Sequence, residues 1–132
     1  MNINSKSGFI TLISVLVAGV IAAAIATSLI LFGLGASRTA FSLEQSNQAK
    51  GLANACAEEA LQRIQSSVSF TGGDTLALGQ GTCDYTVTNQ GGQNRTIVST
   101  GTVASIVRRV RVVIDKITPS INIVSWQEVA DF

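Results

Sequence analysis

A run without a single charged residue separates Lys6 from Arg38, and it restricts what this chain can become more than any other feature. From Ile10 to Leu34 most side chains are Ile, Leu, Val, Ala, Gly or Phe. About 20 such residues suffice for a helix to cross the core of a bilayer. The apolar region of a cleaved secretory signal is shorter, with ~7–15 residues. The run therefore predicts one membrane-spanning helix.

The charges that flank the run indicate its orientation. Lys6 and the amino terminus lie on the short side, whereas Arg38 on the long side is soon followed by Glu44. Basic residues favour the cytoplasmic side of a membrane. We therefore expect the amino terminus inside and the rest of the chain outside.

Beyond Arg38 the composition becomes polar, but no proline interrupts the helix. Apolar residues recur at spacings of three and four, which is the pattern of one buried helix face. We expect a continuous helix over residues 9–67 that ends before the Gly72-Gly73 turn signal. The predicted buried stripe is formed by Ala49, Leu52, Ala53, Cys56, Ala60 and Ile64.

The last part of the chain has a period of two, which is typical of β-strands. In the segment CDYTVTN, residues 83–89, Cys83, Tyr85 and Val87 fall on one face. We expect Trp126 to pack in the core against the helix. The predicted class is α+β, with the long helix packed on a four-stranded antiparallel sheet. Its strands are expected at residues 83–89, 95–103, 106–115 and 121–129.

The composition argues against catalysis. The chain has no histidine, a formal net charge of +1 and only 13% charged residues. Histidine is the commonest general base and metal ligand, so its absence removes the usual partners of a nucleophile or a metal ion. No phosphate-binding loop or nucleophile–base pair is visible. We expect a protein that is not an enzyme and has no cofactor and no metal.

The two cysteines, Cys56 and Cys83, fall on the predicted apolar face of the helix and at the start of a strand. An even pair in a chain that faces an oxidising compartment favours a disulfide. The alternative is two free buried thiols. We expect the disulfide.

One basic cluster stands out and comprises Arg108, Arg109, Arg111 and Lys116. Two interpretations are open. The cluster either contacts an anionic partner, such as a DNA backbone or an acidic neighbouring subunit, or forms a solvated strand face whose charges protect a sheet edge.

The motif Gly8-Phe9-Ile10-Thr11-Leu12-Ile13 joins a short basic leader directly to the apolar helix. Together with a helix that continues onto an antiparallel sheet, it resembles the type IV pilins and pilin-like proteins, including the pseudopilins of type II secretion. The resemblance implies cleavage after Gly8 and N-methylation of Phe9. It implies three parts: a leader (1–8), a transmembrane and filament-core helix (9–36), and an extracytoplasmic head (37–132).

The resemblance also implies a function and partners. The chain would be a structural subunit of a type IV pilus-like or secretion-like filament that starts as a single-pass protein of the inner (cytoplasmic) membrane. Its partners would be other pilin subunits, a prepilin peptidase, an assembly platform and motor ATPase, and membrane lipid before assembly. The alternative is a single-span surface binding module, an adhesin or weak DNA binder, that does not polymerise.

One position departs from the family pattern. The family has a glutamate at the fifth mature position, and this chain has Ile13 there. A carboxylate in lipid needs a charged partner, and in the family that partner is the amino terminus of a neighbouring subunit. The chain therefore resembles a minor or divergent member, and its place in a filament stays open.

Overall fold

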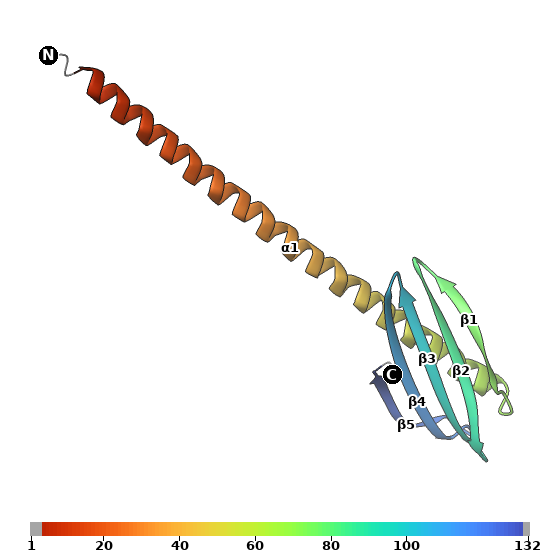
Figure 1. Ribbon diagram of the computed structural model, residues 1–132. Helices are drawn as coiled ribbons and strands as arrows, with labels where there is room; N and C mark the ends of the chain where they lie inside the picture. Colours follow the sequence, from red (N-terminus) through yellow and green to blue (C-terminus); the bar gives the residue numbers. More distant parts are fainter. Residues whose placement is uncertain (1–3, 131–132) are drawn as a thin grey trace. The chain divides into compact units, whose positions relative to one another are not determined.

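The computed structural model describes the backbone of residues 4–130 and the side chains of residues 7–130. The chain divides into two compact units, residues 1–41 and 42–132, and each is described by itself. The α+β class predicted from the sequence is confirmed. The elements are α1 (Asn4–Ser66), β1 (Gly72–Leu78), β2 (Gly81–Gly91), β3 (Asn94–Val103), β4 (Ile106–Lys116) and β5 (Asn122–Val129) (Figure 1).

The part of α1 that belongs to the second unit packs on the sheet through small residues. Alanine has the highest helix propensity, and a stripe of alanines lets the helix approach the strands closely. The helix ends where the amide of Ser67 donates to the carbonyl of Arg63 at 2.9 Å. The residues of the helix that are fully buried are Ala49, Ala53, Cys56, Ala57, Ala60 and Ile64.

The five strands form an antiparallel meander in the order β1-β2-β3-β4-β5. Burial along β2 alternates, and the predicted inward residues Cys83, Tyr85 and Val87 are buried. This alternation follows from the period of two in a strand with one covered face. The core that the helix covers also includes Ile97, Val110, Val112, Ile114 and Ile117.

The number of strands differs from the prediction, which was four. Gly72 and Gly73 do not form a separate turn but begin β1, which pairs with β2 over its whole length. Gly73 lies so close to β2 that an added Cβ would stand 2.1 Å from the carbonyl oxygen of Tyr85. Gly73 therefore serves a strand that approaches its neighbour closely rather than a break in the chain.

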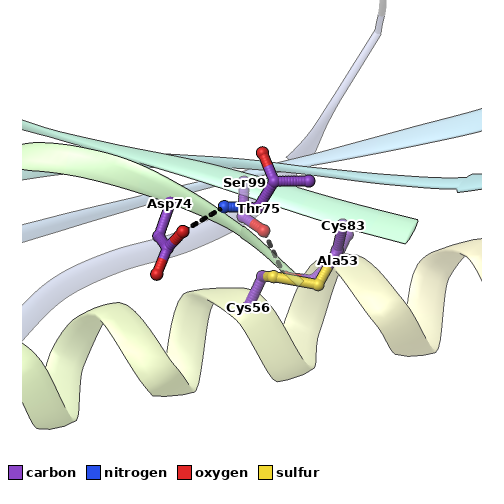
Figure 2. Close-up of a disulfide and its surroundings, with 6 residues drawn as sticks. All are labelled: Ala53, Cys56, Asp74, Thr75, Cys83 and Ser99. Atoms are coloured by element: carbon purple, nitrogen blue, oxygen red, sulfur yellow. Dashed lines mark hydrogen bonds between the residues drawn. A yellow bond between two sulfur atoms is a disulfide. The ribbon is translucent and has the colours of Figure 1, made fainter. Parts of the chain in front are cut away.

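Two contacts bring α1 close to β3. The hydroxyl of Ser99 donates to the carbonyl of Ala53 at 2.6 Å, and both residues are buried (Figure 2). At Gly101 an added Cβ would stand 2.1 Å from the carbonyl oxygen of Ala49 and 2.6 Å from the amide nitrogen of Ala53. Only a residue without a side chain fits between the helix and the strand at this point.

A buried arginine connects the loop after α1 to the β2–β3 turn. Arg95 is 4% exposed, and its guanidinium donates to the side-chain oxygen of Asn89 and to the carbonyls of Gly92, Asn94 and Val68 at 2.8–2.9 Å. Hydrogen bonds to oxygen atoms make the burial of a charged group tolerable. Arg95 therefore holds the β2–β3 turn against the loop that follows the helix.

Trp126 lies outside the core, contrary to expectation. Its side chain is 37% exposed, and its indole nitrogen donates to the side-chain oxygen of Asn54 on α1 at 3.1 Å. β5 is an edge strand, so a side chain there has neighbours on one side only. Trp126 therefore contacts the flank of the helix instead of packing beneath it.

Candidate functional site

The main functional candidate in the first unit is its apolar surface, residues 9–34, which we call the apolar segment. Every residue of this segment is exposed, and its large apolar side chains range from 44% exposed at Ile13 to 79% at Phe32. By length and composition α1 is the one helix in the described part of the chain that could cross a membrane. α1 is therefore a candidate membrane-spanning helix near the amino terminus.

The hydroxyl groups of the apolar segment bond to the helix itself. Thr11, Ser14, Thr27 and Ser28 each donate to a carbonyl three or four residues earlier. A polar group without a partner is costly in hydrocarbon, and such back-bonding removes that cost. The segment thus presents an apolar surface to its surroundings despite its four hydroxyls.

The positions that resemble a leader-processing site lie at the start of this segment. Gly8 is part of α1, with no atom near the place where a Cβ would stand, and Phe9 is 65% exposed. Residues 1–3 of the expected leader lie outside the described residues. Ile13, at the position of the family glutamate, is an exposed apolar residue like its neighbours.

The predicted disulfide is present in the second unit. Cys56 of α1 bonds to Cys83 of β2, with Cα atoms 6.1 Å apart and a sequence separation of 27 (Figure 2). Both residues are buried beside the Ser99–Ala53 hydrogen bond. The bond therefore connects the helix covalently to the sheet at the centre of the core.

The four cations of the predicted basic cluster do not form one patch. Arg108 points toward α1 and bonds to the hydroxyl of Ser46 at 2.6 Å, whereas Arg109 lies on the opposite face of the sheet and donates to Thr100 at 3.4 Å. Arg111 shares that outer face, and Lys116 is exposed at the end of β4. Adjacent residues of a strand face opposite ways, so Arg108 and Arg109 lie on different faces of the sheet, and both bond to other residues of the fold.

Arg108 belongs to a charged cluster that joins three elements. The carboxylate of Glu128 on β5 lies 3.1 Å from Arg108 Nη1 and 3.0 Å from Lys50 Nζ of α1. The hydrogen bond from Lys50 is the main cause that lowers the pKa of Glu128 below its ordinary value of 4.5, and Arg108 adds to it against the opposing effect of burial. We call Lys50, Arg108, Glu128 and Ser46 the edge cluster.

The edge cluster gives a prediction for acid stability. A carboxyl whose pKa is lowered on folding stabilises the fold above its ordinary pKa, and this contribution is lost as the pH falls through the lowered value. We expect Glu128→Gln to reduce the free energy of unfolding at neutral pH by about 0.2–1 kcal/mol, the range of a partly exposed ion pair. Urea unfolding of both proteins at neutral pH and well below pH 4.5 measures this difference, which should vanish in acid.

The control for this prediction is Glu58→Gln. Glu58 is exposed on α1 and has no ion pair within the described residues. We expect this variant to change the neutral-pH stability much less than Glu128→Gln does. An equal effect of the two variants would contradict the assignment of the edge cluster.

A second group of charges lies at the end of α1. Arg63 Nε donates to Glu59 at 2.8 Å, and this hydrogen bond is the main cause that raises the pKa of Arg63. Burial raises the pKa of Tyr85, whose hydroxyl has no hydrogen-bond partner within the described residues. No group of three Cys, Asp or Glu side chains in the described part of the chain could hold a metal ion. Arg63 and Glu59 thus form a partly exposed ion pair in the last turns of α1.

Sequence reasoning missed several residues that hold the second unit together. The edge cluster gave no motif, because it joins residues of α1, β4 and β5 that are distant in sequence. Arg95 gave none either, although three of its four partners lie within six residues of it. Gly101 had a signal, since a glycine inside a β-branched strand marks a close approach of another backbone.

No family model, curated protein or solved structure matches this chain.

Proposed function

We propose that this protein is a structural subunit of a type IV pilus-like or secretion-like filament, held in the inner membrane before assembly. The observation that carries the proposal is the exposed apolar segment, which belongs to the same helix that covers a disulfide-bonded sheet. The segment needs an apolar environment, whereas the second unit has a core of its own. A membrane supplies that environment before assembly, and the apolar segments of other copies supply it afterwards.

The transfer from lipid to other copies costs little free energy. Lipid tails are about as apolar as leucine, so helices in membranes associate through packing rather than through the hydrophobic effect. Gly19, Gly33 and Gly35 leave open space on the helix surface where a second helix can approach. Bundling of the apolar segments therefore supports the core of a filament, with the sheet units on its outside.

The proposal includes processing of the amino terminus. A prepilin peptidase cleaves after Gly8 and methylates Phe9, with the amino terminus on the cytoplasmic side. An assembly platform and a motor ATPase then move the subunit into the filament. Ile13 in place of the usual glutamate supports a minor or divergent subunit, because the contact that glutamate makes with the next amino terminus is missing.

Cleavage gives a direct prediction. Gly8→Val and Gly19→Val change two helical glycines that both have open space around them, so neither should disturb the fold. We expect Gly8→Val to abolish cleavage, leaving residues 1–8 on the chain, while Gly19→Val is processed normally. Mass spectrometry of the protein extracted from membranes of a host with a prepilin peptidase measures both masses and the added methyl group.

The result that contradicts the proposal is an unaltered chain that keeps Met1 or begins within residues 22–26. An intact leader would favour the alternative, a single-span surface binding module. The separation of Arg108 from Arg109 and Arg111 weakens the nucleic-acid form of that alternative, because a DNA backbone needs several cations on one face.

A further inference from the structure

The second unit contains an open groove of about 500 Å³ between α1 and the turn that joins β1 to β2. Leu78 on its rim is 42% exposed, and Val103 at its floor is buried. Gly81 lies close to both sides of the groove, since an added Cβ would stand 2.5 Å from Leu52 Cδ1 and 2.5 Å from the carbonyl oxygen of Thr102. We call it the head groove; its lining residues are Gln48, Gly51, Leu52, Leu78, Gly79, Gln80, Gly81 and Val103.

The first unit ends in an exposed aromatic residue outside the uncharged run. Phe41 is 65% exposed and follows Arg38 by three residues, so the two side chains share one face of the helix. Arg38 has no hydrogen bond or ion pair within the described residues. A partner that covers Phe41 would gain the free energy of removing its apolar surface from water, and a carboxylate on that partner could pair with Arg38.

The head groove has a negative charge at its edge. Gln48, which lines the groove, donates its amide to the carboxylate of Glu44 at 3.1 Å. Glu44 is exposed and has no ion pair within the described residues. Along the helix the anion precedes the groove, just as Arg38 precedes Phe41. If two copies lie with their helices parallel, Arg38 of one copy can face Glu44 of the other, and Phe41 of the first can face the head groove of the second.

We propose that Phe41 of one copy inserts into the head groove of a second copy while Arg38 pairs with Glu44 of that copy. The inference rests on the proposed function and names a contact within the filament. With the helices parallel, position 41 of one copy meets residues 48–52 of the next, so the two copies are shifted along the helix axis and the contact does not close into a two-fold dimer. Each copy leaves one of the two surfaces free for the next, and such a heterologous contact builds a continuing assembly.

Photo-crosslinking in membranes tests the contact directly. A benzophenone amino acid at position 41 of the full-length chain is expected to crosslink to residues 48–52 or 78–81 of a second copy. The matched control is position 43. Leu43 is 61% exposed but lies about 200° around the helix from Phe41, so it should give no crosslink to these residues.

Variants give a second, quantitative test. Phe41→Ser is expected to lower the fraction of chain in sedimentable assemblies at least about tenfold, as loss of a central aromatic contact does. Leu43→Ser should leave that fraction within about twofold. Arg38→Glu and Glu44→Arg should each lower assembly, and the two together should restore it, since the pair is then reversed.

The outcomes separate this contact from the proposed function. The proposed contact is wrong, but the proposed filament is not, if the unaltered chain assembles and position 41 crosslinks only to lipid. The same conclusion follows if Phe41→Ser and Leu43→Ser lower assembly equally. Failure of the double charge reversal to restore assembly overturns the ion pair. If the unaltered, processed chain does not assemble at all, both the contact and the filament are wrong.

Discussion

Replacement of Gly101 with alanine is expected to lower the free energy of unfolding of the second unit by about 3 kcal/mol or more. The added Cβ would stand 2.1 Å from the carbonyl oxygen of Ala49 and 2.6 Å from the amide nitrogen of Ala53. Both are backbone atoms of α1, which cannot turn aside as a flexible side chain does. The helix must therefore move off the sheet. Overpacking of a core costs about 1–3 kcal/mol and occasionally more, and a backbone clash belongs at the upper end.

The effect can be followed with the single tryptophan of the chain. Trp126 bonds to Asn54 on the flank of α1, so its fluorescence reports whether the helix lies on the sheet. Urea unfolding of the full chain in detergent micelles gives the free energy. The expected loss is a large share of the roughly 5–15 kcal/mol that stabilises a typical domain.

Gly51→Ala is the matched control for Gly101→Ala. Gly51 lies on the same helix that Gly101 contacts, and no atom stands within 4 Å of the place where its Cβ would be. Alanine is favoured over glycine in a helix by about 1 kcal/mol, so this variant should be as stable as the unaltered chain or more stable. If both variants unfold at the same urea concentration, the close packing of α1 on β3 is wrong.

The helix could be predicted from the sequence because its signals are local. The uncharged run needs nothing beyond its length and composition, and the stripe from Ala49 to Ile64 repeats with the helical period. The strands from β2 onward were also found, since their β-branched residues alternate with polar ones. In each case the residues that decide the element lie within the element.

The first strand could not be predicted in this way. GGDTLAL has one β-branched residue, and two glycines at its start are a turn signal. β1 exists because the free edge of β2 pairs with it and because Leu76 packs against the core. Such a strand depends on its neighbours and not on its own composition.

The sequence suggested a single basic patch that the fold does not form, for a similar reason. Four cations close together in the sequence read as one group, but the strand period separates Arg108 from Arg109. The partner that holds Arg108, Ser46, is 62 residues away in the sequence. A contact at that separation leaves no trace in a single sequence, so the role of Arg108 in the edge cluster could only come from the fold.

Removal of the disulfide is expected to produce the second large loss of stability. The bond between Cys56 and Cys83 closes a loop within the second unit, with a sequence separation of 27. In the chain-entropy model, constraining a loop of this size stabilises a domain by roughly 3–4 kcal/mol. The double variant Cys56→Ala with Cys83→Ala is expected to lose about this amount, because the unfolded chain regains the freedom that the bond removed. Alanine is chosen rather than serine, because serine would place a hydroxyl without a hydrogen-bond partner in the buried core.

A reducing agent supplies the control for the disulfide. Dithiothreitol should lower the urea midpoint of the unaltered chain toward that of the double variant and leave the double variant unchanged. Because Ala53 and Ser99 hold the helix on the sheet next to the bond, the reduced protein should keep its helix content at low urea and unfold earlier. Equal midpoints with and without the reducing agent would mean that the bond adds nothing to stability. In that case the noncovalent contacts, among them the Ser99–Ala53 hydrogen bond and the packing on Gly101, hold α1 to the sheet.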